Sequence, residues 1–248
     1  MLRLTIRIIL TIIVLLLFLL PFFVTSKMRN KRANGKCVRL AFYLGCALWG
    51  IKVKTQGRIS QALPLLVVSN HFSYLDVFAL GSSMEMCFTP KSEVAGWPVI
   101  GFFCKITGCI FIDRRPSQTL RNKSNLDDAI AGGSIVSLFP EGTSNDGSRL
   151  LPFKSSFFSI AENQGLTVQP VSVVYTRLND ESITSENRHI VGWYGDMEFF
   201  PHLMTFLRQK SLEVTLVFHD AVNSKDFTSR KELASYCQDV IGKGLSYC

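Results

Sequence analysis

The sequence predicts an α/β fold, a mixed sheet flanked by helices, with an N-terminal hydrophobic helical membrane element. Short apolar runs alternate with helical stretches from residue 51 onward, which is typical of a layered α/β domain. A nearly unbroken apolar run lies near the N-terminus, and basic residues gather around it. At 248 residues the chain suits one domain with an appendage. We therefore divide it into membrane-anchoring helices, 1–50, and an α/β domain, 51–248.

The first apolar run, from Ile8 to Val24, is interrupted only by Thr11 and Pro21. Its length is at the short end for a membrane span. Because the run is long for a signal peptide and no small-residue cleavage site follows it, we favour an uncleaved anchor. More basic residues follow the run than precede it, which predicts that the body of the protein stays on the cytoplasmic side of the membrane. Hydrophobic length alone does not decide between a spanning helix and one on the membrane surface.

A second apolar segment, 37–51, is too short to span a membrane easily. One prediction places it in the membrane interface, with Lys36 and Arg39 toward the headgroups and Trp49 at the boundary. The other makes it a buried core helix, and periodicity does not separate the two alternatives.

The net charge of +8 is unevenly distributed. The first 75 residues contain eleven Lys or Arg and no Asp or Glu, so the remaining residues carry a net charge of −3. Basic residues that flank apolar segments indicate an anionic membrane surface as the partner, and argue against nucleic acid. The seven cysteines are odd in number and lack a CxxC pair. We therefore expect a reducing compartment, no disulfide framework and no metal site.

Apolar runs and helical periods assign the elements of the α/β domain. The predicted strands are 51–55, 65–69, 86–90, 109–113, 134–139, 168–175, 189–193 and 212–218. The predicted helices are 73–82, 97–107, 117–131, 153–163, 197–209 and 229–242.

The stretch 65–76 carries the first candidate site. Its apolar strand would deliver His71 to the carboxyl end of the sheet, where open α/β sheets keep their sites. Ser73 is a good N-cap, so a helix would start there and place Asp76 in its first turn. Asp76 can then meet His71, fix its tautomer and stabilise the imidazolium. The alternative is a capping box, Ser73-x-x-Asp76, which explains Asp76 without catalysis.

Two later stretches offer sites for an anion. The strand at 109–113 ends in Arg114 and Arg115, which suit a phosphate or carboxylate; the alternative is a solvated strand end. The strand at 134–139 is followed by a loop that contains Glu141 and Gly142. Backbone N–H groups of this loop can hold an anion or a developing oxyanion. Glu141 can accept a hydrogen bond from a substrate hydroxyl. An ordinary turn is the alternative for this loop. Lys154 beyond it would reach an acidic headgroup or be a solvated helix residue.

Together these blocks resemble the glycerolipid acyltransferase family. They are Asn70-His71 to Asp76, Gly108 to Arg114, Phe139 to Thr143 and the Pro-containing strand at 168–171, in family order. The likeness covers nearly the whole chain and is greatest to bacterial 1-acyl-sn-glycerol-3-phosphate acyltransferases.

The resemblance implies a fatty acyl transfer from acyl carrier protein or coenzyme A, with no cofactor, to the hydroxyl of 1-acyl-sn-glycerol-3-phosphate. The product would be phosphatidic acid. His71 matches the general base and Asp76 its partner. Positions that bind the polar end of the acceptor match Arg114, Glu141, Gly142 and Thr143. The oligomeric state stays open.

The chain departs from the family at Ser144. The family usually has an Arg at this position, which would bind the acceptor phosphate. A neutral hydroxyl does not replace a bidentate guanidinium. The cations that can compensate are Arg114, Arg115, Arg149 and Lys154. Otherwise the acceptor is not a phosphate monoester, and the residues around Ser144 also resemble the branch that acylates lyso-ornithine lipid. That lipid is the alternative acceptor, with Ser144 and Lys154 at the substrate.

Two rival classes fit the sequence less well. A membrane-anchored binding module needs the apolar run but not the His71 and Glu141 blocks together. A phospholipase-like hydrolase would normally carry a G-x-S-x-G nucleophile elbow, which the sequence lacks.

Overall fold

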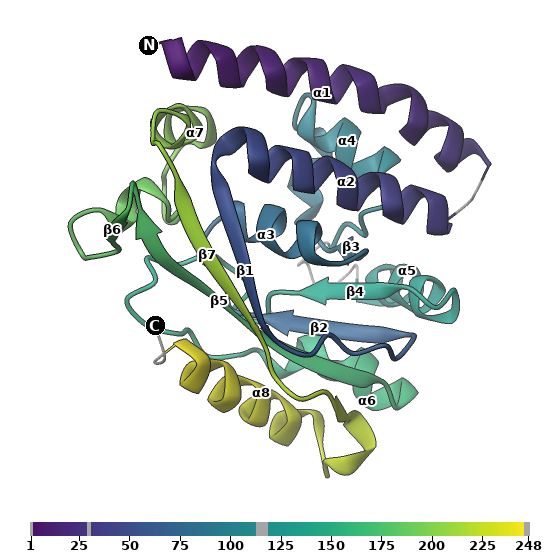
Figure 1. Ribbon diagram of the computed structural model, residues 1–248. Coiled ribbons are helices and arrows are strands. Elements are labelled where there is room, and N and C mark those ends of the chain that lie inside the picture. The colour runs from purple at the N-terminus through teal and green to yellow at the C-terminus, as the bar shows by residue number, and fades with distance from the viewer. Residues whose placement is uncertain (1, 29–30, 113–118, 246–248) are drawn as a thin grey trace.

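A computed structural model describes residues 2–28, 31–112 and 119–245, and within them a mixed sheet of eight strands lies between two layers of helices (Figure 1). The main strand order is β1-β7-β5-β2-β4-β3, and β6 and β8 pair with β5. β5 is antiparallel to β6, β7 and β8, whereas the other pairs are parallel. The predicted fold class is therefore confirmed.

The strands are β1 Ile51–Gly57, β2 Leu65–Ser69, β3 Cys87–Phe88, β4 Ile135–Leu138, β5 Thr167–Leu178, β6 Glu181–Ser182, β7 Leu212–Phe218 and β8 Val222–Asn223. The α-helices are α1 Leu2–Lys27, α2 Lys31–Trp49, α3 Leu75–Ser83, α4 Ile100–Ile106, α5 Thr119–Ala131, α6 Ser159–Gln164, α7 Phe199–Leu207 and α8 Arg230–Leu245. Short 3₁₀ helices are η1 Ser92–Gly96, η3 Ser155–Phe158, η4 Arg188–Ile190 and η5 Ser224–Asp226.

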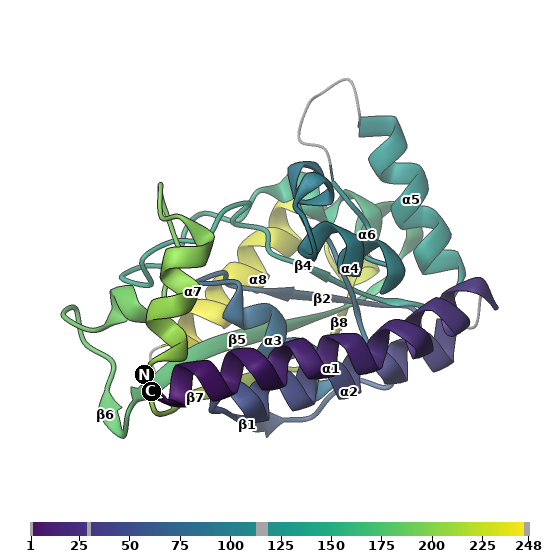
Figure 2. The ribbon, with the colours of Figure 1, turned by 90° about the horizontal axis from the view of Figure 1, so that it is seen from above.

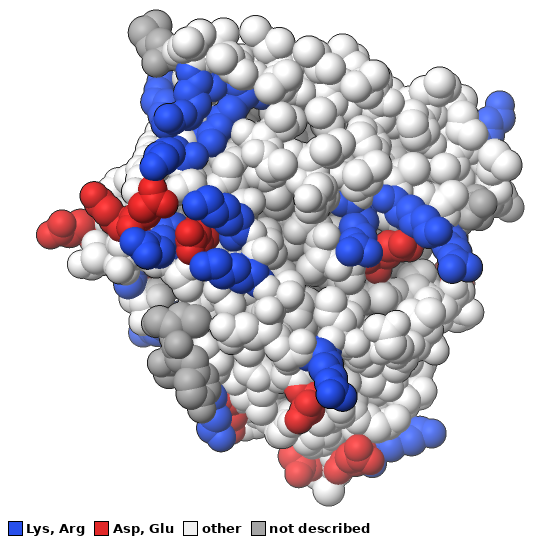
Figure 3. All heavy atoms as spheres, in the orientation of Figure 1, with Lys and Arg blue, Asp and Glu red and all other residues white. Residues whose placement is uncertain are grey.

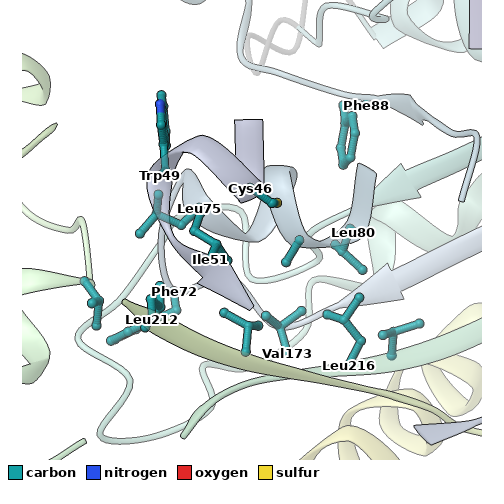
Figure 4. Close-up of a cluster of buried hydrophobic side chains, with 14 of the residues drawn as sticks. Cys46, Trp49, Ile51, Phe72, Leu75, Leu80, Phe88, Val173, Leu212 and Leu216 are labelled. Carbon is teal, nitrogen blue, oxygen red and sulfur yellow. The ribbon is translucent and has the colours of Figure 1, made fainter. Parts of the chain in front are cut away.

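The central strand β2 is buried on both faces of the sheet. Leu65 and Val67 pack into the cluster beneath α2, α3 and α7, which Figure 4 shows with Leu75 and Leu216. Leu66 and Val68 point the other way, into the cluster beneath α6 and α8. Successive side chains of a strand alternate between faces, so a strand covered on both sides reads as a continuous apolar run.

The register of β2 and its neighbours brings three chain segments to one edge. Val68 lies opposite Leu138 of β4, and Ser69 lies opposite Val171 of β5. Because these strands are parallel, the residues that follow β2 and β4 emerge side by side at the carboxyl edge. His71 and the loop that begins at Phe139 therefore meet.

Helix α1 lies along the body rather than projecting from it (Figures 1 and 2). The Arg7 guanidinium donates to three carbonyl oxygens within 207–210, at and just past the end of α7, at 2.6, 3.0 and 3.0 Å. Trp49 Nε1 donates to Thr11 Oγ1 at 2.9 Å. By length and composition α1 is apolar enough to cross a membrane, and only 6% of its most apolar stretch is buried. The division at residue 50 stays a prediction.

Helix α2 is buried on one face and exposed on the other. Val38, Cys46 and Trp49 are buried against the body, whereas Leu40 and Tyr43 are exposed. The core-helix alternative thus describes one face of α2, and the outer face remains available to an interface.

Two predicted strands differ in the structure. At 189–193 the prediction is wrong, since Arg188–Ile190 form η4 and the consecutive residues Val191 and Gly192 are both buried, without the alternation of a strand. Residues 109–112 make one bridge, between Ile112 and Lys91, and residue 113 lies outside the described residues.

Predicted helix boundaries also shift. The helix predicted at 153–163 divides into η3 and α6, and its helical part starts only at Ser155 because Lys154 is extended (φ −75°, ψ 111°). The two-residue strands β6 and β8 were not predicted, since two residues are too few to show an alternation.

Candidate active site

His71 and Asp76 form a hydrogen-bonded pair at the carboxyl end of β2. His71 Nδ1 lies 2.8 Å from Asp76 Oδ2. The Asp76 side chain is fully buried, whereas 19% of the His71 side chain is exposed. A carboxylate at Nδ1 holds the proton on that nitrogen, which leaves Nε2 free to take a proton from a reactant.

The buried Asp76 carboxylate has several other donors. Its Oδ2 accepts the N–H groups of Phe72 at 2.7 Å and Ser73 at 3.0 Å. Its Oδ1 accepts the Tyr175 hydroxyl at 2.6 Å. Burial, reinforced by the Asp76 charge, raises the pKa of Tyr175 well above its ordinary value, so the phenol keeps its proton and serves as a donor. Charge-assisted bonds of this kind offset the cost of burying a carboxylate.

The predicted capping box is only half present. Asp76 accepts the Ser73 N–H as a capping box requires, but the Ser73 hydroxyl is buried with no partner among the described residues. Helix α3 begins at Leu75, so the prediction that Ser73 caps it is wrong. The Asp76 carboxylate already takes the Ser73 N–H, and it links the turn to His71 at the same time.

Asn70 fixes the point at which the chain leaves the sheet. Its Nδ2 donates to the Val173 carbonyl at 2.9 Å, and its Oδ1 accepts the Val173 N–H at 2.8 Å. The side-chain amide thus continues the pairing between β2 and β5 past the last residue of β2. His71 follows from an anchored position.

Glu141 ties the loop after β4 to the loop after β2. It is 2% exposed, and its Oε1 accepts the His71 N–H at 2.6 Å. Its Oε2 accepts the Leu151 N–H at 2.9 Å and Asn145 Nδ2 at 2.5 Å. Burial raises the pKa of Glu141, and the N–H groups of His71 and Leu151 oppose that shift. Both oxygens therefore face the protein, and a direct contact of Glu141 with substrate stays a prediction.

The rest of the loop after β4 also borders His71. The Phe139 ring stacks on the imidazole with centroids 4.0 Å apart. Gly142 has φ +71°, and a Cβ there would lie 2.8 Å from Lys154 Nζ, so the ammonium covers this turn closely. Thr143 is exposed and Ser144 half-buried.

Arg114, with its neighbour Arg115, lies outside the described residues. Its predicted contact with the acceptor therefore stays a prediction.

A hollow of about 410 Å³ opens beside the same loop. Its lining residues are Ser144, Asn145, Asp146, Ser148, Arg149, Leu151, Tyr194 and Gly195. One lining residue is bonded directly to His71, since the Asn145 N–H donates to the His71 carbonyl at 3.2 Å.

Sequence reasoning missed Tyr175 and Asn145. Tyrosine is common in strands, so Tyr175 gives no local sign that it serves a carboxylate 99 residues away. Asn145 accepts the Gly147 N–H at 2.6 Å, an Asx turn that an Asn-x-Gly pattern can indicate. Its bond to Glu141 depends on the fold.

Comparisons with known proteins show which family the chain resembles. The profile of the Acyltransferase family matches residues 50–174. The chain is 34% identical over 241 residues to a lyso-ornithine lipid O-acyltransferase of Brucella abortus, covering 93% of this chain and 90% of that protein. It is 38% identical over 206 residues to a protein of the same name from Rhodobacter capsulatus, covering 80% of this chain and 72% of that protein.

A shorter match, 34% identical over 113 residues, is to the 1-acyl-sn-glycerol-3-phosphate acyltransferase of Neisseria gonorrhoeae, covering 45% of this chain and 44% of that one. The crystal structure of a Thermotoga maritima 1-acyl-sn-glycerophosphate acyltransferase superposes with a TM-score of 0.68 at 19% identity over 97% of both chains, a likeness of fold. The matched profile and the long relatives agree with the four sequence blocks, and this protein belongs to the glycerolipid acyltransferase family.

Proposed function

We propose that this protein transfers a fatty acyl group from an acyl thioester to the free hydroxyl of lyso-ornithine lipid, giving ornithine lipid. The observation that carries the reaction is the His71–Asp76 pair, 2.8 Å apart at the carboxyl edge of the sheet. The acceptor rests on relatives of that name, which cover up to 93% of the chain, and on Ser144.

Lysophosphatidic acid, the first expectation from the sequence, becomes the second candidate. The similarity to the Neisseria enzyme favours it, although that match covers only 45% of this chain. The donor is a thioester of acyl carrier protein or coenzyme A.

The difficult step in this reaction is activation of the acceptor, since a thioester needs no enzyme nucleophile. His71 removes the hydroxyl proton as the oxygen attacks the thioester carbonyl, and Asp76 stabilises the imidazolium that forms. The C–S bond then breaks, and the proton on His71 passes to the departing thiolate. General-base assistance of this kind is typically worth ~10²–10⁴-fold in rate.

The tetrahedral intermediate carries an oxyanion that needs donors. Gly142 is not one of them, because its N–H donates to the Phe139 carbonyl at 2.9 Å. The N–H groups of Thr143 and Ser144 have no acceptor within the described part of the chain and are the backbone candidates. The Lys154 ammonium above Gly142 adds positive charge beside them.

The body is held at the inner membrane, on its cytoplasmic side, by α1 lying in the plane of the interface. A spanning α1 would lose the contacts of Arg7 with α7 and of Thr11 with Trp49. Leu16, Leu17 and Leu20 are 60–70% exposed, and the surface over α1 is largely free of charge in Figure 3. An in-plane apolar face of this kind suits a bilayer interface, where the lysolipid acceptor also resides.

The anchor is tested by placing charge on that face without deleting the helix. Leu17→Glu with Leu20→Glu is expected to shift the protein from the membrane pellet to the soluble fraction after lysis. The thermal unfolding midpoint in detergent should stay near that of wild type, because both side chains are exposed. Full retention in the membrane would count against this anchor.

The reaction is tested with the membrane-bound protein, a labelled acyl thioester, and lyso-ornithine lipid and lysophosphatidic acid offered separately. We expect label in ornithine lipid, loss of turnover in His71→Ala, and normal turnover in His189→Ala, which removes an exposed imidazole. Turnover retained by a folded His71→Ala protein would overturn the mechanism. Label in phosphatidic acid alone would restore the second candidate acceptor.

A further inference from the structure

The hollow beside His71 contains opposite charges that the reaction described above does not use. Asp146 Oδ1 accepts the Ser148 N–H at 3.0 Å and its hydroxyl at 2.6 Å, whereas Oδ2 has no donor within the described residues. These bonds, and then Arg188 and Arg149, lower the pKa of Asp146, so the carboxylate is ionised at neutral pH. The exposed Arg149 guanidinium makes no hydrogen bond or ion pair with a described residue.

The loop that lines the hollow contacts the loop that carries His71. Gly147 has φ +70°, and any Cβ there would collide with the Phe72 ring, next to His71. Asn145 joins the loop to Glu141 at 2.5 Å and to the His71 carbonyl at 3.2 Å. A headgroup in the hollow would therefore be held at a fixed place relative to the imidazole.

The charges select against a phosphate monoester. A dianionic phosphate in this space could pair with Arg149, but it would also meet the Asp146 carboxylate and find a neutral hydroxyl at Ser144. A headgroup with one ammonium and one carboxylate meets a partner of opposite sign for each charge. An ornithine that is attached to its lipid through one amino group keeps a free ammonium and a free carboxylate.

We propose that this hollow is the headgroup subsite for a zwitterionic amino-acid lipid, with Asp146 binding the ammonium and Arg149 binding the carboxylate. The proposal rests on the proposed acyl transfer to a lysolipid and adds the residues that choose the acceptor. Ser144 leaves room for the headgroup, where a longer cationic side chain would compete with its ammonium.

The test pairs each charge of the protein with one charge of the acceptor. The acceptors are lyso-ornithine lipid, the same lipid acetylated on its free amine, and the same lipid as its carboxylate methyl ester. The variants are Asp146→Asn and Arg149→Gln. Asp226→Asn and Arg230→Gln are matched controls at exposed positions on η5 and α8.

We expect Asp146→Asn to lower kcat/KM for lyso-ornithine lipid by about tenfold or more, mainly through KM, as is typical of a lost charge-assisted hydrogen bond. With the acetylated lipid, kcat/KM of the wild-type protein should already be low, because the ammonium is missing. Asp146→Asn should then lower kcat/KM by less than about a further twofold. Arg149→Gln should show the same pattern with the methyl ester, and the two controls should match wild type. Equal losses with native and modified lipids would overturn the subsite, because they would mean that the variants disturb only the loop.

A binding measurement separates failure of the subsite from failure of the proposed reaction. If wild type forms no product from either lysolipid, the acyl transfer is wrong. Equilibrium binding of lyso-ornithine lipid in detergent then decides the subsite by itself. Weaker binding to Asp146→Asn than to Asp226→Asn supports it, and equal binding overturns it.

Discussion

Tyr175→Phe removes one donor from the buried Asp76 carboxylate and leaves the aromatic ring in place. The lost bond is the 2.6 Å contact from the Tyr175 hydroxyl to Asp76 Oδ1. Hydrogen bonds to charged groups contribute about 1.5–3 kcal/mol, and the vacated Oδ1 is too deeply buried for water to replace the donor freely. We expect the free energy of unfolding to fall by about 2 kcal/mol. For a chain of this size that corresponds to a decrease of roughly 4–8 °C in Tm.

The effect of Tyr175→Phe on turnover should be smaller than that of Asp76→Asn. Phe72 and Ser73 still donate to Asp76 Oδ2, the oxygen that faces His71, so the imidazole keeps its orientation. We expect kcat to fall less than about tenfold in Tyr175→Phe. Asp76→Asn removes the negative charge opposite the imidazolium and should cost ~10²-fold or more, within the range typical of general-base catalysis.

The assays are thermal unfolding in detergent, followed by tryptophan fluorescence, and acyl transfer from a labelled thioester. Tyr236→Phe is the matched control, because its hydroxyl makes no hydrogen bond within the described part of the chain. An unchanged Tm in Tyr175→Phe would refute the assigned contribution of this bond. A loss of kcat as large as that of Asp76→Asn would mean that Tyr175 takes part in proton transfer itself.

Three further predictions concern single residues. Glu141→Gln leaves one acceptor oxygen for the three groups that donate to Glu141. We expect the free energy of unfolding, measured by denaturant titration, to fall by about 1–3 kcal/mol. We also expect kcat to fall, because His71 is then positioned less well. Ser144→Arg restores the cation common in the family; the ratio of phosphatidic acid to ornithine lipid formed should rise about tenfold or more, and an unchanged ratio would remove Ser144 from acceptor choice. Burial lowers the pKa of His219 in the folded state, so the unfolded chain binds a proton first and stability falls as the pH drops through the ordinary histidine range. His219→Gln should therefore lose less Tm than wild type between pH 7.5 and 5.5, and equal losses would contradict this source of acid sensitivity.

Local patterns in the sequence determined the strands that carry the site. The apolar run at 65–68 predicts a strand buried on both faces, and such a strand places the next polar residues at its carboxyl end. The order of the motif blocks was sufficient to suggest the family before any contact was known. The apolar run at 8–24 likewise indicated a membrane helix, because composition and length alone set that property.

Only the tertiary structure decided which groups hold the His71–Asp76 pair and where α1 lies. Tyr175 and Asn70 reach their partners because β2 pairs with β5, and strand order is set by packing of the whole sheet. The Ser73 hydroxyl does not cap α3, and the Asp76 N–H that such a cap would accept donates instead to the Ser73 carbonyl at 3.1 Å. The hollow is lined by loop 144–151 and by Tyr194 and Gly195, which lie about 45 residues later in the chain. Hydrophobic periodicity does not predict that these distant segments are neighbours. Sequence periodicity reports which face of an element is buried, whereas the partners of a buried polar group depend on contacts between elements far apart in the chain.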